Sequence, residues 1–113
     1  FNTLRIERSC WSLLNRSISY VQTRVNSNDR IFSDFWPYFG FFTNSTIIMP
    51  QESFYTFEEL KKLIEETKPT YVITRGGIRG FEELPKVMET GNYILDTSFE
   101  NYCGRINVYR YIQ

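Results

Sequence analysis

The chain of 113 residues contains no histidine. This absence excludes Ser-His-Asp and Cys-His catalytic triads, and it excludes any zinc site that uses histidine ligands. General acid–base chemistry would therefore fall to carboxylates, tyrosine or lysine. The sequence also lacks any run of 18 apolar residues, so no segment is expected to span a membrane.

Cysteine is scarce, since only Cys10 and Cys103 occur and they form no CxxC motif. The two thiols either form a disulfide in an oxidising compartment or lie apart as small buried side chains. Charge has no excess of either sign, because 13 basic residues balance 13 acidic ones. The balance gives no long-range attraction to nucleic acid, and no nucleic-acid partner is predicted.

Aromatic residues are abundant, at 18% of the chain, and they cluster in the stretch DFWPYFGFF. Helical spacing puts Phe35, Phe39 and Phe42 on one face, which predicts a short helix packed against the core. Trp36 and Tyr38 point elsewhere and are predicted to be exposed. Such amphipathic rings suit half-wet surfaces, so Trp36 and Tyr38 are expected to face a ligand, a partner or the membrane interface.

Signals for helix and strand alternate along the chain. An apolar stripe at spacings of three and four predicts the first helix, and the capping box Thr-Phe-Glu-Glu predicts the start of the second. The expected order is a helix over 11–25, strands over 30–33 and 46–49, a capped helix from 56 to before Pro69, a strand over 71–74, a helix ending near 90, and strands over 93–99 and 105–111.

This order predicts an α/β fold, a small three-layer Rossmann-like sandwich. Its sheet is expected to be mostly parallel and to end in a C-terminal antiparallel hairpin whose last strand lies at an edge. Residues 1–113 are of the size of one domain, and a single α/β domain is predicted. Because the chain begins with Phe1 rather than Met, we expect it to be a fragment of a larger protein.

Three features follow predicted strands, where ligands bind in sheets of this kind: Asp34, the turn over 50–52 and the loop over 75–80. Asp34 follows the strand over 30–33 and is the one acid placed like a functional group, although it can also cap the helix of the aromatic stretch. The loop RGGIRG follows the strand over 71–74. Its glycines allow backbone amides to face an anion and its arginines add positive charge, so the loop can bind a phosphate or sugar phosphate.

The residues predicted to bind such an anion are Arg75, Gly76, Gly77 and Arg79. The alternative for this loop is a surface turn with solvated arginines. Pairs of glutamates at 58–59, 65–66 and 82–83 are interpreted as solvated helix faces rather than as a glycosidase pair. No catalytic residue and no metal ligand is predicted.

Three segments in order, ISYVQTRVNSNDRIFSDFWPYFGFFTNSTIIMP, TFEELKKLIEETKPTYVIT and INVYRYI, carry a resemblance that covers residues 9–113. They resemble the globular domain that follows the transmembrane helices in membrane-embedded glycosyltransferases of the GT-C type. The family phrase D-R-I-x-x-D corresponds to Asp29, Arg30, Ile31 and Asp34. The phrase K-P-x-Y-V-I corresponds to residues 68–73.

The resemblance implies a non-catalytic domain on the extracytoplasmic face of a cell membrane, within an integral-membrane glycosyltransferase. Such enzymes transfer sugar from polyprenyl- or dolichol-phosphate donors, and their catalytic acid lies in loops among the transmembrane helices. The fragment alone is then expected to be inactive and to need no cofactor. Its expected partners are the transmembrane portion of the same chain, the membrane surface, and a glycan or protein acceptor.

Two alternatives stay open. One is a free-standing domain that binds an anion, a nucleotide or a sugar phosphate through the loop over 75–80. The other is a protein-interaction module that pairs through the tyrosine-rich strand over 108–111.

Overall fold

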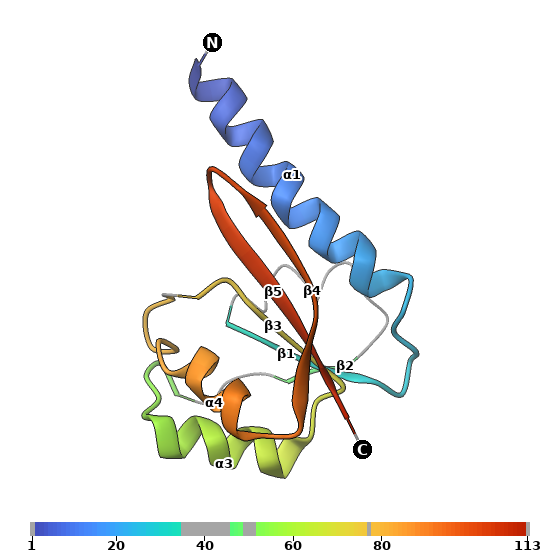
Figure 1. Ribbon diagram of the computed structural model, residues 1–113, viewed down its shortest axis with the longest axis vertical. Helices are drawn as coiled ribbons and strands as arrows, with labels where there is room; N and C mark the ends of the chain where they lie inside the picture. The colour runs from blue at the N-terminus through green and yellow to red at the C-terminus, as the bar shows by residue number, and fades with distance from the viewer. Residues whose placement is uncertain (1, 35–45, 49–51, 77, 113) are drawn as a thin grey trace.

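The computed structural model describes residues 2–34, 46–48, 52–76 and 78–112, and the side chains of its first helix from residue 12 onward. The elements are α1 (Asn2–Gln22), β1 (Arg30–Ser33), β2 (Thr46–Ile47), α3 (Phe57–Thr67), β3 (Tyr71–Thr74), α4 (Leu84–Thr90), β4 (Tyr93–Asn101) and β5 (Gly104–Tyr111). The strands form one five-stranded sheet with the order β2-β1-β3-β5-β4 (Figure 1).

The elements follow the local signals of the sequence closely. β1 and β3 have the predicted bounds, and β4 and β5 extend the predicted strands by one or two residues. The capping box is confirmed: Thr56 Oγ1 accepts a hydrogen bond from the Glu59 amide at 3.3 Å, and the Glu59 carboxylate accepts one from the Thr56 amide at 3.0 Å. α1 begins earlier and ends earlier than predicted, at Asn2 and Gln22.

Helices pack on both faces of the sheet, because alternate strand residues point to opposite sides. On one face α1 packs against the sheet in a cluster of buried residues: Leu13, Ile18, Val21, Ile31, Tyr71, Ile73, Ile106 and Val108. On the other face α3 and α4 pack in a second cluster: Phe32, Tyr55, Leu60, Ile64, Val72, Phe81, Leu84, Val87 and Met88.

The prediction of a mostly parallel Rossmann-like sandwich is wrong, because the sheet is mixed. β1 pairs in parallel with β2 and β3, whereas β5 pairs antiparallel with both β3 and β4. β4 points in the same direction as β3, as the strand–helix–strand alternation suggests, but β5 lies between them. The predicted edge position of the last strand is therefore also wrong, since β4 forms the edge and β5 is central.

The side chains of the two strands explain this placement. Ile106 and Val108 of β5 are buried, whereas β4 carries the acids Asp96 and Glu100 and leaves Leu95 53% exposed. The strand with two buried apolar side chains lies in the centre, and the acids of β4 stand at the edge, where charged residues prevent unwanted pairing with other chains.

β4 contains a bulge that changes the direction of its side chains. The register with β5 shifts between Leu95 and Thr97, which leaves Asp96 as the extra residue. Before the bulge Tyr93 packs with the α3–α4 cluster, and after it Phe99 packs with the α1 cluster. Asp96 accepts a hydrogen bond from the Tyr20 hydroxyl of α1 at 2.6 Å, so the bulge ties the hairpin to this helix.

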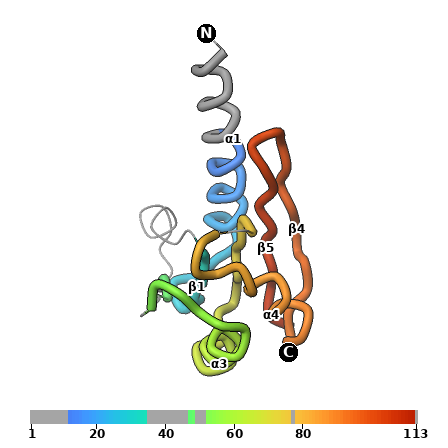
Figure 2. Tube along the Cα trace, turned by 90° about the vertical axis from the view of Figure 1, so that its left-hand side faces the viewer, coloured from blue at the N-terminus to red at the C-terminus, as the bar shows by residue number. Residues whose placement is uncertain are grey.

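The hairpin of β4 and β5 extends alongside α1, as both views show (Figure 2). Within the described part of the chain, no helix combines the length and the apolar character that crossing a bilayer requires. The aromatic stretch over 35–42, with its predicted helix, lies outside the described residues.

Candidate functional site

The site predicted by the sequence lies where β1 and β3 end side by side, because the two strands are parallel neighbours. Asp34 directly follows β1 and is 6% exposed. Its carboxylate accepts a hydrogen bond from the Thr74 hydroxyl at 2.6 Å and another from the Arg75 amide at 3.2 Å. Thr74 Oγ1 in turn accepts a hydrogen bond from the Gly76 amide at 3.0 Å. The acid thus joins the end of β1 to the end of β3 and to the loop that follows it.

Burial dominates the electrostatics of Asp34. Removal of the carboxylate from water raises the pKa of Asp34, while the hydrogen bonds from the Thr74 hydroxyl and the Arg75 amide act in the opposite direction. The desolvation effect is the larger, so the charged form is disfavoured relative to an aspartate in water.

A polar row crosses three strands at this end of the sheet. Thr74 pairs with Asn107 of β5, and both lie on the sheet face that carries Val72 and Tyr109. Asp34, Thr74 and Asn107 are therefore consecutive in a row on that face. The Oδ1 atom of Asn107 is buried and accepts no hydrogen bond within the described residues. Sequence reasoning identified Asp34 but not Thr74 or Asn107, because only the pairing of β3 with β5 brings them together.

The loop after β3 uses its backbone donors inside the protein. The Arg75 amide bonds Asp34, the Gly76 amide bonds Thr74, and the Gly80 amide bonds Glu82 Oε1 at 2.6 Å. An anion-binding loop needs amides that point at the ligand. These three amides already have acceptors, which weighs against an anion site built on them.

The two arginines of this loop have different surroundings. The Arg75 guanidinium donates to the Cys103 carbonyl at 3.2 Å, which ties the loop to the tip of the β4–β5 hairpin. Arg79 is exposed, and Gly77 lies outside the described residues. The loop does not lead directly into a helix either, since α4 begins only at Leu84.

The remaining predicted residues are placed as follows. Trp36 and Tyr38 lie outside the described residues. The glutamate pairs have ordinary roles, since Glu59 completes a capping box and Glu66 lies 3.9 Å from Lys62. In the described ranges no three histidine, cysteine, aspartate or glutamate side chains gather as a metal site would require.

Cys103 is disulfide-bonded, so of the two states that the sequence allowed the structure has the oxidised one. Cys10 is the only other cysteine in the chain. Disulfides persist in oxidising compartments and are rare in the cytosol.

No family model matches the chain, and neither the curated proteins nor the solved structures compared with it give a match.

Proposed function

We propose that this chain is the non-catalytic extracytoplasmic domain of an integral-membrane glycosyltransferase that uses a polyprenyl- or dolichol-phosphate-linked sugar as donor. In this proposal the catalytic groups lie in a membrane-embedded portion of the same protein. The domain shapes the entrance for the acceptor or the donor, next to the membrane surface.

The disulfide of Cys103 is the observation that carries the extracytoplasmic part of the proposal. Cys103 lies at the tip of the β4–β5 hairpin, and its carbonyl accepts a hydrogen bond from the Arg75 guanidinium. A structural disulfide fits a compartment where thiols are oxidised, and it would not persist against the thiol reductants of the cytosol.

The chemistry of Asp34 supports the non-catalytic part. Its carboxylate is buried, and it accepts hydrogen bonds from two groups of the neighbouring strand and loop. A general acid or base must reach the proton of a substrate, whereas these bonds direct the acid inward. We therefore assign Asp34 the role of holding the ends of β1 and β3 together.

The two phrases that carry the family resemblance lie together in the fold. D-R-I-x-x-D ends in β1 and Asp34, and K-P-x-Y-V-I runs from the C-cap of α3, Lys68, into β3. Because β1 and β3 are adjacent parallel strands, the phrases form one structural unit rather than two unrelated matches. That the two phrases lie side by side in the fold supports the use of the family resemblance as the basis of the proposal.

The position of β5 in the sheet is unfavourable for the alternative of a protein-interaction module that pairs through this strand. Residues 108–111 belong to β5, whose backbone pairs with β3 on one side and β4 on the other. Addition of a partner strand needs an open edge, which β5 does not have.

Fractionation of the native protein tests the proposal. An antibody raised against this domain should detect a band several times larger than the domain, in membranes, released by detergent and not by salt or alkali. Alkylation without reductant should leave Cys103 unlabelled in intact cells. A soluble band at the mass of the domain itself, or a freely alkylated Cys103, would refute the proposal.

A further inference from the structure

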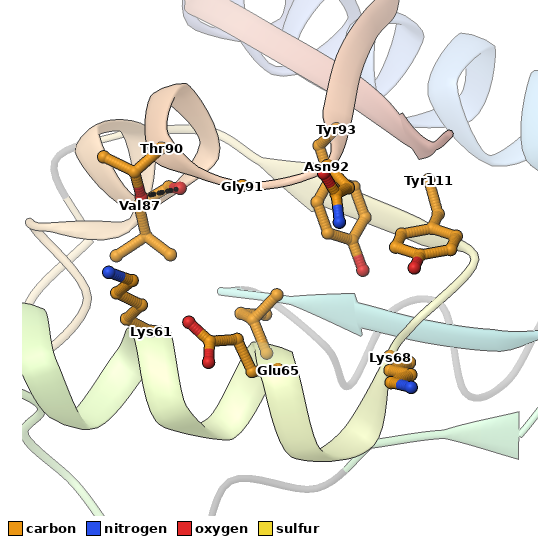
Figure 3. A pocket seen from close by; sticks show the side chains of 10 residues that line it. Lys61, Glu65, Lys68, Val87, Thr90, Gly91, Asn92, Tyr93 and Tyr111 are labelled. Carbon is orange, nitrogen blue, oxygen red and sulfur yellow. Dashed lines mark hydrogen bonds between the residues drawn. The ribbon is translucent and has the colours of Figure 1, made fainter. Parts of the chain in front are cut away.

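A cavity of about 430 Å³ lies at the opposite end of the sheet from Asp34. It is bounded by α3 from Lys61 onward, the end of α4, the start of β4 and the end of β5 (Figure 3). Its volume is in the range of small-molecule sites. The cavity shares no residue with the site at the ends of β1 and β3, and an inference from it does not depend on the proposed function.

The two long walls of the cavity differ in character. Lys61, Glu65 and Lys68 line it from α3, while Asn92, Tyr93 and Tyr111 line it from the strand ends opposite (Figure 3). The rings of Tyr93 and Tyr111 pack edge to face with centroids 5.4 Å apart. The Tyr93 hydroxyl donates to the Pro69 carbonyl at 2.6 Å, which holds this aromatic wall in place.

Several polar groups of the cavity have no hydrogen-bond or ion-pair partner in the part of the chain that the structure describes. Among the described residues, none accepts from or pairs with the ammonium groups of Lys61 and Lys68, and none bonds the Glu65 carboxylate or the Tyr111 hydroxyl. The carboxamide of Asn92 is likewise exposed and unbonded within that part of the chain. Donors and acceptors thus alternate around a partly aromatic cavity.

The spacing of the charges argues against a compact anion such as phosphate. Lys61 and Lys68 are seven residues apart, or two helical turns, which separates them by about 10 Å along the helix. Glu65 lies between them on the same wall and repels an anion. An anion held between the two ammonium groups would lie beside the Glu65 carboxylate, and the apolar part of the lining would remain unused.

Carbohydrate chemistry fits the same lining. Sugar hydroxyls both donate and accept hydrogen bonds, so they match an alternation of ammonium, carboxylate and carboxamide groups. The apolar face of a sugar ring packs on tyrosine, a side chain that combines an apolar body with a polar tip. We propose that this cavity binds a short neutral saccharide, with two linked rings spanning the distance from Lys61 to Lys68.

A second cavity supports an extended rather than a single-ring ligand. It measures about 610 Å³, adjoins the first at Lys68 and Tyr111, and is lined further by Asp29, Thr70 and Arg110. The two cavities share Lys68 and Tyr111 in their linings, so a linear saccharide that passes these two side chains would extend beyond the first two units.

Titration of the isotope-labelled chain with maltose, cellobiose, lactose and N,N′-diacetylchitobiose, followed by amide NMR shifts, tests this site. At least one disaccharide should move the amide signals of Gly91, Asn92, Tyr93 and Tyr111. Glucose and inorganic phosphate serve as comparison ligands. The double variant Glu65→Ala with Asn92→Ala should weaken binding about tenfold or more, because both residues are exposed and their loss leaves the core intact.

Glu66→Ala is the matched control, since Glu66 is an exposed neighbour on α3 that pairs with Lys62 and does not line the cavity. It should leave the affinity unchanged. The proposal fails if no disaccharide shifts these amides at tens of millimolar, or if the double variant binds like the wild type. Equal shifts and affinity with phosphate or glucose would also overturn it, since the site would then recognise an anion or a single ring.

Discussion

Replacement of Asp34 by alanine removes the acceptor of two hydrogen bonds at the ends of β1 and β3. Thr74 is only 1% exposed, so a hydroxyl left without its acceptor costs about 1–3 kcal/mol. The Arg75 amide lies nearer the surface, where water can replace the carboxylate as acceptor. Loss of this second hydrogen bond therefore costs less stability than loss of the first. We expect the free energy of unfolding to fall by about 2–3 kcal/mol, which lowers the melting temperature by roughly 10 °C for a domain of this size.

Asp29 provides a matched control, because its carboxylate also accepts one backbone amide and one threonine hydroxyl. The donors are the Asn26 amide at 2.8 Å and the Thr70 hydroxyl at 3.3 Å, both close to the surface. Asp29→Ala should cost about 1 kcal/mol or less. The assay is urea denaturation followed by circular dichroism, with the midpoint compared at constant slope. If Asp34→Ala costs no more than Asp29→Ala, burial does not govern the strength of this network.

The pH dependence of Asp34 follows from the direction of its pKa. Because the pKa of Asp34 is raised in the folded protein, the folded state binds this proton more tightly than the unfolded state. Its contribution to stability is complete below the ordinary aspartate pKa and is lost as the pH rises through the raised value. The stability of the wild type relative to Asp34→Asn should therefore be greater at about pH 3 than at neutral pH. A difference that instead grows with pH would show that the folded protein prefers the charged carboxylate.

Four further substitutions test the fold. Gly80→Ala should lower the free energy of unfolding by more than about 2 kcal/mol, because φ is +92° and the new Cβ would collide with the Ser53 carbonyl oxygen. Gly76→Ala, at φ +77° but with open space around the new Cβ, should lower it by about 1 kcal/mol. Equal losses of stability in thermal unfolding would contradict the collision. Thr56→Ala removes the helix cap of α3 and should lower the urea-unfolding free energy by about 1 kcal/mol, and no change would mean that the capping box is not populated in solution. Cys103→Ser should lower the free energy of unfolding by about 2–4 kcal/mol in thermal or urea unfolding. Added dithiothreitol should destabilise the wild type but not the variant. Insensitivity of the wild type to reductant would contradict a structural disulfide.

The location of the elements was predictable from local sequence. The apolar stripe of the first helix, the capping box at Thr56 and the apolar runs of β1 and β3 each depend on residues within one or two turns of chain. The position of Asp34 at the end of β1 was predictable for the same reason. Nothing local, however, indicates that this carboxylate bonds Thr74 across 40 residues of sequence.

The order of the strands was beyond local patterns. A hairpin can add to a sheet through either of its strands, and both choices keep the same turn and the same residue alternation. The two arrangements differ in which strand of the hairpin has a neighbouring strand along both of its edges. Here β5 takes the central place and leaves the acidic β4 at the edge, so the sheet is mixed where a mostly parallel sheet with a terminal antiparallel hairpin was expected. The bulge at Asp96 was similarly hidden, because it appears only in the register with β5.

The sequence by itself determined where the chain is helical or extended, which residues are apolar enough for the core, and that an acid follows the first strand. Those properties follow from propensity, periodicity and capping, which act between residues close in the chain. Tertiary structure alone decided that β5 lies between β3 and β4, that Asp34 bonds inward to Thr74 and Arg75, and that α3 faces the ends of β4 and β5 across a polar cavity. Each of these depends on contacts between distant segments, whose free energy is fixed only once the layers have packed together.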